Sequence, residues 1–384
     1  MFLKEYEGRD LFQKYGIPVP RGMLFKSDDL QGKFLAAKCD ACISVFPDVR
    51  DFVLKAQLLS GKRGKRGGVV FTGAENLFES LEKMSGMELD GEKIQEILVE
   101  ERIQIAREFY LSIAIDRHER RPVILFSSSG GVDIEEAAKK DPGSVVEVMF
   151  DSVDDFDEKK VSAALVHYGV DGSTVSGLLE TCEKLAFLFK NEHGVLAEIN
   201  PLALTKAGTI MAMDSKIIID DSALFLHPEQ KERKLLQLSP LEREAIAFGL
   251  SYVELEGDIA IIGNGAGLVM ATLDAVSRYG GKPANFCDVG GGASTEMMEK
   301  ALDIVLKKKG VKTIFIDIFG GITHCDEIAE GILDYRKRAK LSVPVTLRMV
   351  GTNQEKAKKM LEAEGFKVFH TFEDGARHAA KLSS

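Results

Sequence analysis

The sequence predicts an α/β protein of two domains, and the second domain is expected to contain a doubly wound parallel sheet. Three observations support this. The chain has 384 residues, and at roughly 150 residues per domain that suits two or three domains. Its first part reads as short strands with one hairpin. From about residue 245 onward, strand-like runs, glycines and helical segments alternate, which is typical of a parallel sheet with helices on both faces.

The composition is that of an ordinary globular protein. Hydrophobic residues make up 45% of the chain and charged residues 29%, which excludes a disordered chain, a collagen and a disulfide scaffold. Lys and Arg total 50 against 60 Asp and Glu, so the net charge is −10. This balance disfavours nucleic-acid binding as a general role. It remains compatible with a local basic patch for phosphates.

The sequence also argues against a membrane or secreted protein. The longest uncharged apolar stretch, Ile259 to Leu273, is shorter than the about 20 apolar residues that a membrane helix needs. The first residues include acids and lack an apolar core, so they do not read as a signal peptide. Five cysteines, an odd number, favour a reducing, cytoplasmic location. Cys39 and Cys42 form a CxxC, but without a second pair at zinc spacing we interpret them as buried thiols.

The first domain is assigned to residues 1–225. An opening helix carries Leu3, Leu11 and Phe12 on one face and ends at Gly16. Strands are expected at 52–56, 97–100, 109–115 and 123–127, helices at about 158–167 and 175–191, and a hairpin of 195–205 with 209–219. The charged segment of about 226–244 looks irregular and is interpreted as the linker between domains.

The second domain is assigned to residues 245–384. Its strands are expected at 259–262, 284–287, 313–318, 343–347 and 366–369, with helices beginning near residues 267, 294, 323, 353 and 372. Five strands in this length suit a flavodoxin-like doubly wound fold, in which ligands bind beyond the carboxyl ends of the strands. Three glycine clusters fall at such ends: 263–267, 290–292 and 320–321.

A basic, glycine-rich loop follows the strand that ends near Lys55. Residues 61–68 contain four glycines and four cations, and backbone amides together with Lys and Arg are suited to phosphate oxygens. The loop is not a Walker A motif, because GxxxxGK[ST] is absent. A solvated, flexible loop is the alternative, but a lysine at the strand end favours phosphate binding.

The hairpin brings a second set of polar residues together. Asn200 and Asp214 are each seven residues from Ala207, and Glu198 and Lys216 are each nine residues from it. Opposed side chains in a regular hairpin have Cβ atoms about 5 Å apart, and an amide oxygen with a carboxylate suits Mg²⁺. A polar pair on a wet face is the alternative. Because Pro201 follows Asn200 within an apolar strand, we favour the metal.

The glycine clusters of the second domain offer two further sites. At 320–326 a strand turns into a helix, whose N-terminal amides attract anions; Thr323 as a plain N-cap is an alternative that is compatible with this. Residues 263–267 read GxGxG, and Asp288 lies near the spacing of a ribose-binding acid. The third glycine of a dinucleotide fingerprint would be at position 268, which is Leu268. An NAD-type oxidoreductase is therefore the alternative from another class.

The seven histidines give no clear catalytic setting. None forms an HxxxH pair, and most are expected to be exposed or to have a satisfied hydrogen bond. His324 alone lies beside a candidate anion site.

Taken together, these motifs resemble the β-subunit family of succinyl-CoA synthetase, the nucleoside-diphosphate-forming succinate–CoA ligase. The resemblance covers essentially the whole chain in order, and the residues that carry it are 3–12, 15–20, 198–202, 263–268, 283–292 and 318–322. It implies an N-terminal ATP-grasp domain and a C-terminal flavodoxin-like ligase domain. It also implies Mg²⁺, ATP/ADP or GTP/GDP, and a partner α subunit with the CoA site, in an αβ or α2β2 assembly.

The resemblance further implies a reaction and a role for matching residues. Succinate, CoA and ATP would give succinyl-CoA, ADP and phosphate through a phosphohistidine on the α subunit, which Glu198 would contact when it visits the ATP-grasp domain. The nucleotide would be held by Lys55, Lys62, Arg63, Gly64, Glu100, Ile103 and Glu108, the Mg²⁺ by Asn200 and Asp214, and the acyl substrate by Asn264, Gly321, Ile322 and Thr323.

Three positions depart from the family pattern. Residues 61–64 read Gly-Lys-Arg-Gly where Gly-Gly-Arg-Gly is usual, Ser215 stands where glycine is common, and His324 stands where arginine is usual. Because His324 lies next to the substrate helix, the same chemistry on malate or citrate is an alternative to succinate. Pro20 and the general pattern favour the ADP-forming type. A non-catalytic nucleotide- or CoA-sensing module is a further alternative, against which Lys55, Asn200 and Asp214 speak.

Overall fold

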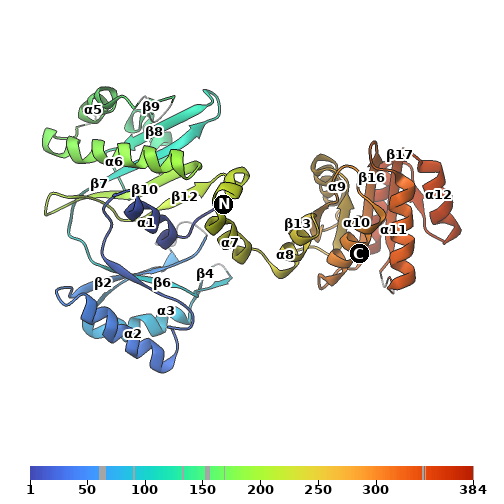
Figure 1. Cartoon of the computed structure of the whole chain (residues 1–384), viewed down its shortest axis with the longest axis horizontal. Helices are drawn as coiled ribbons and strands as arrows, with labels where there is room; N and C mark the ends of the chain where they lie inside the picture. The colour runs from blue at the N-terminus through green and yellow to red at the C-terminus, as the bar shows by residue number, and fades with distance from the viewer. Residues whose placement is uncertain are drawn as a thin grey trace. The chain divides into compact units, whose positions relative to one another are not determined.

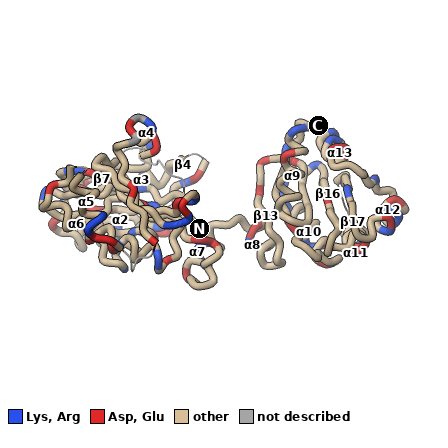
Figure 2. The backbone as a smooth tube through the Cα atoms, turned by 90° about the horizontal axis from the view of Figure 1, so that it is seen from above, with Lys and Arg blue, Asp and Glu red and all other residues tan. Residues whose placement is uncertain are grey.

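The computed structural model describes residues 1–59, 66–89, 91–131, 134–151, 156–167, 169–339, 341 and 343–383. The chain forms two compact units that meet in sequence between Lys231 and Glu232. Figure 2 shows basic and acidic positions interspersed along both of them. Within the described part of the chain, no helix combines the length and the apolar character that crossing a bilayer requires.

The first unit contains an antiparallel sheet in the order β1-β6-β2-β3. Its strands are β1 (Gly22–Phe25), β2 (Asp51–Ala56), β3 (Val69–Gly73) and β6 (Ile97–Glu101). The helices α2 (Gly32–Val45) and α3 (Leu77–Ser85) lie on one side of this sheet (Figure 1), and their apolar residues share a core with it. A small hairpin of β4 (Glu88–Leu89) and β5 (Glu92–Lys93) precedes β6.

A second sheet of this unit has the order β11-β10-β7-β8-β9, with β12 also paired to β10. Its strands are β7 (Ile105–Asp116), β8 (Arg121–Ser127), β9 (Val146–Met149), β10 (Gly194–Thr205), β11 (Ile210–Ala212) and β12 (Lys216–Ile219). The hydrophobic core beside this sheet also includes residues of α1 (Glu5–Lys14), α5 (Glu158–His167) and α6 (Gly172–Asn191). The short helices α4 (Ile134–Lys140), η2 (Ala74–Asn76), η3 (Pro142–Ser144) and η5 (Asp221–Leu226) complete the unit.

The predicted hairpin has the predicted register but is not regular throughout. Leu202 pairs with Ala212, and Glu198 pairs with Lys216. The expected second strand is interrupted between β11 and β12 at residues 213–215. On its other side β10 shifts register against β7 between Ile199 and Leu202, where Pro201 has no N–H to donate to the ladder. These irregularities fall beside Asn200 and Asp214.

The predicted irregular linker is instead largely helical. It contains α7 (Pro228–Gln237) and the start of α8 (Pro240–Ala247), so this expectation was wrong. Both helices begin with proline, which is favourable at the first helical position, and Ser239 with Glu242 forms a capping box for α8. The charged residues that looked irregular lie on exposed or half-buried positions of these helices. The boundary between the two units falls within α7.

The second unit contains a sheet in the order β13-β15-β14-β16-β17-β18. The strands are β13 (Ser251–Glu254), β14 (Ile259–Gly263), β15 (Asn285–Asp288), β16 (Thr313–Gly320), β17 (Val345–Gly351) and β18 (Val368–Phe369). Taken in chain order from β14, the parallel strands follow the order 2-1-3-4-5 of flavodoxin-like folds. The antiparallel edge strand β13 was not predicted, because it has only four residues and most of them are not buried.

Helices cover both faces of this sheet, as predicted (Figure 2). The helices are α9 (Ala266–Arg278), α10 (Thr295–Lys307), α11 (Cys325–Arg338), α12 (Gln354–Ala363) and α13 (Phe372–Ser383). Ile259 and Ile261 contribute to the core with α9 and α13, whereas Ala260 and Ile262 contribute to the core with α10, α11 and α12. This alternation follows from the two-residue period of a strand.

Candidate functional site

Lys55 lies in a buried cluster of charges in the first unit. Its Nζ donates to Glu5 Oε1 over 2.8 Å and to the backbone oxygen of Met213 over 2.5 Å, and it lies 2.6 Å from Glu100 Oε2. Arg9 Nε is 3.1 Å from the other oxygen of Glu100. The break between β11 and β12 leaves the Met213 carbonyl available for this contact. The ammonium group thus has two hydrogen-bond acceptors and one ion-pair partner around it.

A second layer of hydrogen bonds fixes Glu5. Gln57 Nε2 donates to Glu5 Oε2 over 3.2 Å, and Gln57 Oε1 accepts from the backbone N–H of Tyr6. Ser215 Oγ donates to the backbone oxygen of Glu5 over 2.9 Å. The helix α1, the end of β2 and the hairpin are therefore joined at this cluster.

The charges of the cluster determine its protonation. Burial alone would lower the pKa of the Lys55 ammonium, but Glu100, Glu5 and Asp214 outweigh it and hold that pKa above its ordinary value. Burial raises the pKa of Glu100, although Lys55 opposes this. A small cavity borders the cluster and is lined by Glu5, Arg9, Phe12, Val19, Glu100, Ala212, Met213, Asp214 and Ser215. Lys55, Glu100 and Asp214 are thus brought together from three predicted segments.

Asn200 and Glu108 are connected through a glycine turn after β8. Asn200 Oδ1 accepts from the backbone N–H of Gly131 over 2.9 Å, and the Glu108 backbone oxygen accepts from Gly130 over 3.1 Å. Gly131 has a φ of 69°, and a Cβ there would lie 2.4 Å from Glu108 Oε2. A side chain at this position would be strained and would displace the carboxylate.

Glu198 lies in the same strand as Asn200, two residues earlier in β10. Its Oε2 lies 3.1 Å from the hydroxyl of Tyr110, which also lies 3.0 Å from Ser112 Oγ. Burial and the charge of Glu198 raise the pKa of Tyr110, so the phenol remains a hydrogen-bond donor near neutral pH. Ile103 lies half-buried between β6 and β7. The predicted nucleotide-binding residues Lys62, Arg63 and Gly64 lie outside the described residues.

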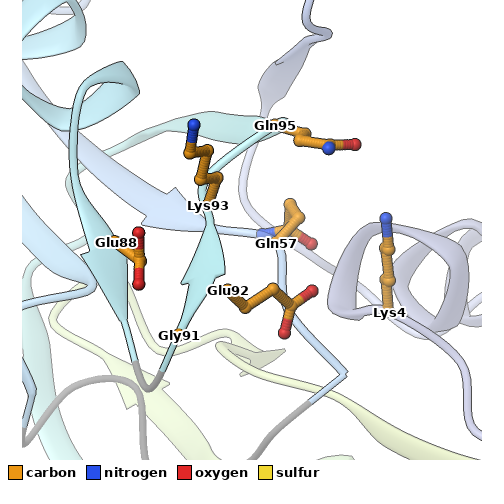
Figure 3. Close-up of a pocket in the computed structure, with 7 residues that line it drawn as sticks. All are labelled: Lys4, Gln57, Glu88, Gly91, Glu92, Lys93 and Gln95. Atoms are coloured by element: carbon orange, nitrogen blue, oxygen red, sulfur yellow. The ribbon is translucent and has the colours of Figure 1, made fainter. Parts of the chain in front are cut away.

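A polar pocket opens beside Gln57 (Figure 3). It has a volume of about 390 Å³ and is lined by Lys4, Gln57, Glu88, Gly91, Glu92, Lys93 and Gln95. Lys4 also donates to Glu96 over 2.7 Å. The pocket is therefore bordered by α1, the end of β2 and the β4–β5 hairpin, next to the amide that fixes Glu5.

In the second unit the three glycine clusters meet at the carboxyl ends of β14, β15 and β16. Asp288 Oδ1 accepts from the backbone N–H groups of Gly265 over 2.6 Å and of Gly290 over 2.7 Å. Thr323 Oγ1 accepts from Gly292 over 2.9 Å. Gly265, with a φ of 103°, has a backbone conformation that L side chains rarely adopt.

The side chain of Asn264 forms two hydrogen bonds with the backbone of β16. Its Oδ1 accepts from the backbone N–H of Phe319 over 2.9 Å, and its Nδ2 donates to the Phe319 carbonyl over 2.9 Å. Asn264 Nδ2 also lies 3.2 Å from Thr323 Oγ1. The side-chain amide thereby takes the place of a backbone peptide beside β16. It holds the segment that carries the predicted substrate residues 321–323.

The helix α11 begins later than predicted. Its N-cap is His324, without a side-chain cap, so the reading of Thr323 as N-cap was wrong. The Thr323 hydroxyl is instead engaged by the other glycine clusters. Gly321 and Ile322 are exposed, and 85% of Ile322 is accessible to solvent. His324 is half-exposed, and its Nδ1 lies 3.2 Å from Glu327.

Comparison with known families and proteins covers the whole chain. Residues 2–204 match the family model of the ATP-grasp domain, and residues 262–382 match that of CoA-ligase. The β subunit of the ADP-forming succinate–CoA ligase of Methanocaldococcus jannaschii is 40% identical over 380 residues, which cover 98% of each chain. The GDP-forming counterpart from Thermus thermophilus is 39% identical, over 98% of this chain and 97% of its own. The chain belongs to this β-subunit family.

The family assignment confirms the resemblance and the predicted fold class of an ATP-grasp domain followed by a flavodoxin-like ligase domain. The fold also resembles ATP citrate lyase from Methanothrix soehngenii, with a TM-score of 0.76 and 18% identity over 99% of both chains. The NAD-type alternative finds no support. The strand order is not the 3-2-1-4-5-6 of a dinucleotide-binding sheet, and Asp288 braces two glycine turns of the ligase domain.

Sequence reasoning missed several residues of the Lys55 cluster. Glu5, Arg9 and Met213 contact Lys55 or Glu100 from segments far away in sequence. Glu5 is 4% exposed, although acids in the first turn of a helix are usually exposed, so no signal in the local sequence indicates that Glu5 has a buried cation partner.

Proposed function

We propose that this chain is the β subunit of a succinate–CoA ligase, most closely of the ADP-forming kind. Together with an α subunit it would convert succinate, CoA and ATP to succinyl-CoA, ADP and phosphate, through a phosphohistidine on α. The observation that carries the proposal is the 40% identity over 98% of both chains to a β subunit of that name. Under this proposal the chain would be an acid–thiol ligase subunit in a reducing cytoplasm, in an αβ or α2β2 assembly.

The nucleotide is proposed to bind in the first unit, at Lys55, the loop of residues 62–64, Glu100, Ile103 and Glu108. Positive charge near the phosphates supports phosphoryl transfer by positioning and by stabilising developing charge. Lys55 remains cationic in its cluster, and the 390 Å³ pocket lies beside that cluster. A phosphate oxygen could take the place of one of the three oxygens that now surround the Lys55 ammonium.

Asn200 and Asp214 fit Mg²⁺ by their chemistry. They offer an amide and a carboxylate oxygen, the kind of ligand that Mg²⁺ prefers, and the rest of its shell would come from water and phosphate. The pairs Leu202–Ala212 and Glu198–Lys216 keep them within one register of the hairpin. Bound Mg²⁺ would neutralise charge on the phosphates. Asn200 is held in place by Gly131 and Asp214 by the backbone N–H of Ser215.

The acyl substrate is proposed to bind at Asn264 and residues 321–323. These lie where the three glycine clusters meet and where α11 begins, so exposed backbone N–H groups and the helix dipole would favour a carboxylate or phosphate. Because both polar atoms of Asn264 bond to Phe319, its main proposed role is to position the 321–323 segment. Glu198 is proposed to steady the phosphohistidine in the first unit.

The test of this function is a two-chain assay. The purified chain is combined with its cognate α subunit, and thioester formation is measured from a panel of acids with CoA, Mg²⁺ and either ATP or GTP. Succinate with ATP should be the best pair, and the chain without α should form no thioester. A parallel incubation of the chain alone with labelled ATP and Mg²⁺ should give no acid-labile phosphoprotein. Stable phosphohistidine on the isolated chain would overturn the subunit assignment.

His324 stands where the family usually has arginine. Another acid, such as malate or citrate, is therefore a second candidate substrate. His324→Arg is expected to change the ratio of kcat/KM between succinate and these acids by about 10-fold, because arginine adds a fixed charge and bidentate donors. The readout is the same acid panel with the two-chain enzyme. The control is His118→Arg, since His118 is exposed in the turn after β7. An unchanged preference would mean that this position does not read the acid.

A further inference from the structure

A cluster of two histidines and two glutamates lies in the first unit, away from the proposed nucleotide site. Glu192 is the C-cap of α6, and His193 follows it with a φ of 53°. His227 ends η5 and directly precedes α7, and Glu229 is the second residue of α7. Figure 1 shows α1 and α6 in this unit, to which the first residues of α7, up to Lys231, also belong. The cluster therefore joins the end of one long helix to the beginning of another.

One carboxylate oxygen of this cluster is buried without a hydrogen bond. Glu192 is 1% exposed, and within the part of the chain that the structure describes its Oε2 has no hydrogen-bond partner. Its Oε1, in contrast, accepts from Lys14 Nζ over 2.6 Å and from the Tyr15 hydroxyl over 2.9 Å. Burial and the bond to Glu192 raise the pKa of Tyr15 to about 12, so Tyr15 stays a donor. These contacts fix the carboxylate with Oε2 directed at His227.

The gap between Glu192 and His227 is too long for a hydrogen bond. Glu192 Oε2 lies 3.6 Å from His227 Nδ1, while His227 Nε2 lies 2.9 Å from His193 Nδ1. If His227 donates to His193, its Nδ1 is a bare lone pair that faces a carboxylate oxygen. If His193 is the donor, His227 Nδ1 carries the proton but is still beyond hydrogen-bond distance. In both tautomers the buried oxygen lacks a good partner.

The same spacing suits two ligands of one metal ion. With bonds of about 2.1 Å to nitrogen and oxygen, the ligand atoms of a tetrahedral zinc site lie about 3.4 Å apart. Glu229 supplies a third ligand, since the ligand atoms of Glu192, His227 and Glu229 all lie within 4.8 Å of one another. The hydrogen bond from His227 to His193 is the kind of outer contact that fixes the tautomer of a ligating histidine.

We propose that Glu192, His227 and Glu229 bind a divalent transition-metal ion of the Zn²⁺ type, with water as the fourth ligand. One imidazole and two carboxylates form a nitrogen–oxygen donor set that favours such an ion over Mg²⁺, which prefers oxygen ligands alone. The two glutamates and Lys14 together carry a net charge of −1, which favours a bound cation. Glu229 is exposed, so the site has an entry path from solvent.

The expected role of this ion is structural. It would tie the first turn of α7 to the end of α6, and through the Lys14 and Tyr15 bonds to α1. The site is independent of the proposed ligase function, because none of its residues belongs to the nucleotide or acyl sites.

The experiment is titration of the full chain with Zn²⁺ after removal of metals by a chelator. It is run in excess Mg²⁺, which keeps the proposed Mg²⁺ site filled, and is repeated with Co²⁺, whose visible absorption reports tetrahedral nitrogen–oxygen coordination. The variants are His227→Asn and Glu229→Gln. Glu158→Gln is the matched control, because Glu158 is likewise an exposed glutamate in the first turn of a helix. Circular dichroism checks that each variant is folded.

The wild-type chain is expected to bind one Zn²⁺ per chain and to give the Co²⁺ band. His227→Asn should weaken Zn²⁺ binding by about 100-fold and Glu229→Gln by about 10-fold, and Glu158→Gln should bind like the wild type. Should His227→Asn fail to fold, the exposed Glu229→Gln decides alone. Absence of Zn²⁺ binding in excess Mg²⁺, or affinities of the folded variants that match the control, would overturn the proposal.

Discussion

Asp214→Asn is expected to lower the Mg²⁺-dependent turnover of nucleotide by the two-chain enzyme by about 100-fold or more. The substitution removes a negative charge that is proposed to hold Mg²⁺ at the phosphates, where electrostatic stabilisation has its largest effect. The fold should persist, because an asparagine oxygen can still accept from the Ser215 backbone N–H, as Asp214 Oδ1 does over 2.7 Å. The measurement is kcat/KM for ATP across a series of Mg²⁺ concentrations, with the unfolding midpoint as a check.

The control for this prediction is Asp220→Asn. Asp220 follows β12 directly, and its side chain accepts from Ser222 at the start of η5, so it matches Asp214 in its local role but not in its proposed metal contact. Asp220→Asn should retain turnover within about twofold, since an exposed substitution of this kind has small effects. Unchanged turnover and unchanged Mg²⁺ dependence in Asp214→Asn would show that this carboxylate does not hold the metal.

Lys55→Met is expected to destabilise the first unit by about 3–5 kcal/mol, because it leaves buried carboxylates without their cation. Glu5 and Glu100 are 4% and 2% exposed and both contact the Lys55 ammonium. Methionine fills a similar volume, so the effect reports the charge and hydrogen bonds rather than a cavity. Urea unfolding of the full chain, followed by far-UV circular dichroism, gives the change in the free energy of unfolding.

The matched control for this variant is Lys4→Met. The Lys4 ammonium forms an ion pair with Glu96, and both side chains are partly exposed, so the loss of this charge should cost no more than about 1 kcal/mol. Equal effects of the two substitutions would contradict the view that the Lys55 cluster is a buried ion network. If Lys55→Met leaves enough folded protein, its nucleotide affinity should also fall more than its affinity for the acyl substrate.

Much of the fold follows from local patterns in the sequence. The alternation of strand, glycine and helix after residue 245 predicts the parallel sheet, because each apolar run can be buried only between helices on both faces. The positions of Asn200 and Asp214 around Ala207 predict the hairpin register, which the structure has. The irregularities were not predictable in the same way. The break at 213–215 leaves the Met213 carbonyl to Lys55, which lies in another sheet and far away in sequence.

Site residues were predictable where they lie close together in the sequence. They were not predictable where the fold brings them together from distant segments. Lys55 stands out because a charged residue ends an apolar strand, and Gly321 because a strand turns into a helix there. Glu5 meets Lys55 from 50 positions away, and His193 meets His227 from 34. No periodicity in the sequence relates such pairs, so their proximity appears only when α1, α6 and α7 are placed in space.

The two hydrogen bonds of Asn264 have a consequence for the chemical ageing of the protein. Asparagine followed by glycine is prone to deamidation, in which the next backbone nitrogen attacks the side-chain carbonyl with little steric hindrance. In the native ligase domain Phe319 holds the Asn264 amide on both sides, and the Gly265 nitrogen is bound to Asp288. The reacting atoms are thus kept apart while the sheet is intact. Deamidation at this Asn–Gly pair should therefore mark molecules in which the domain has already opened.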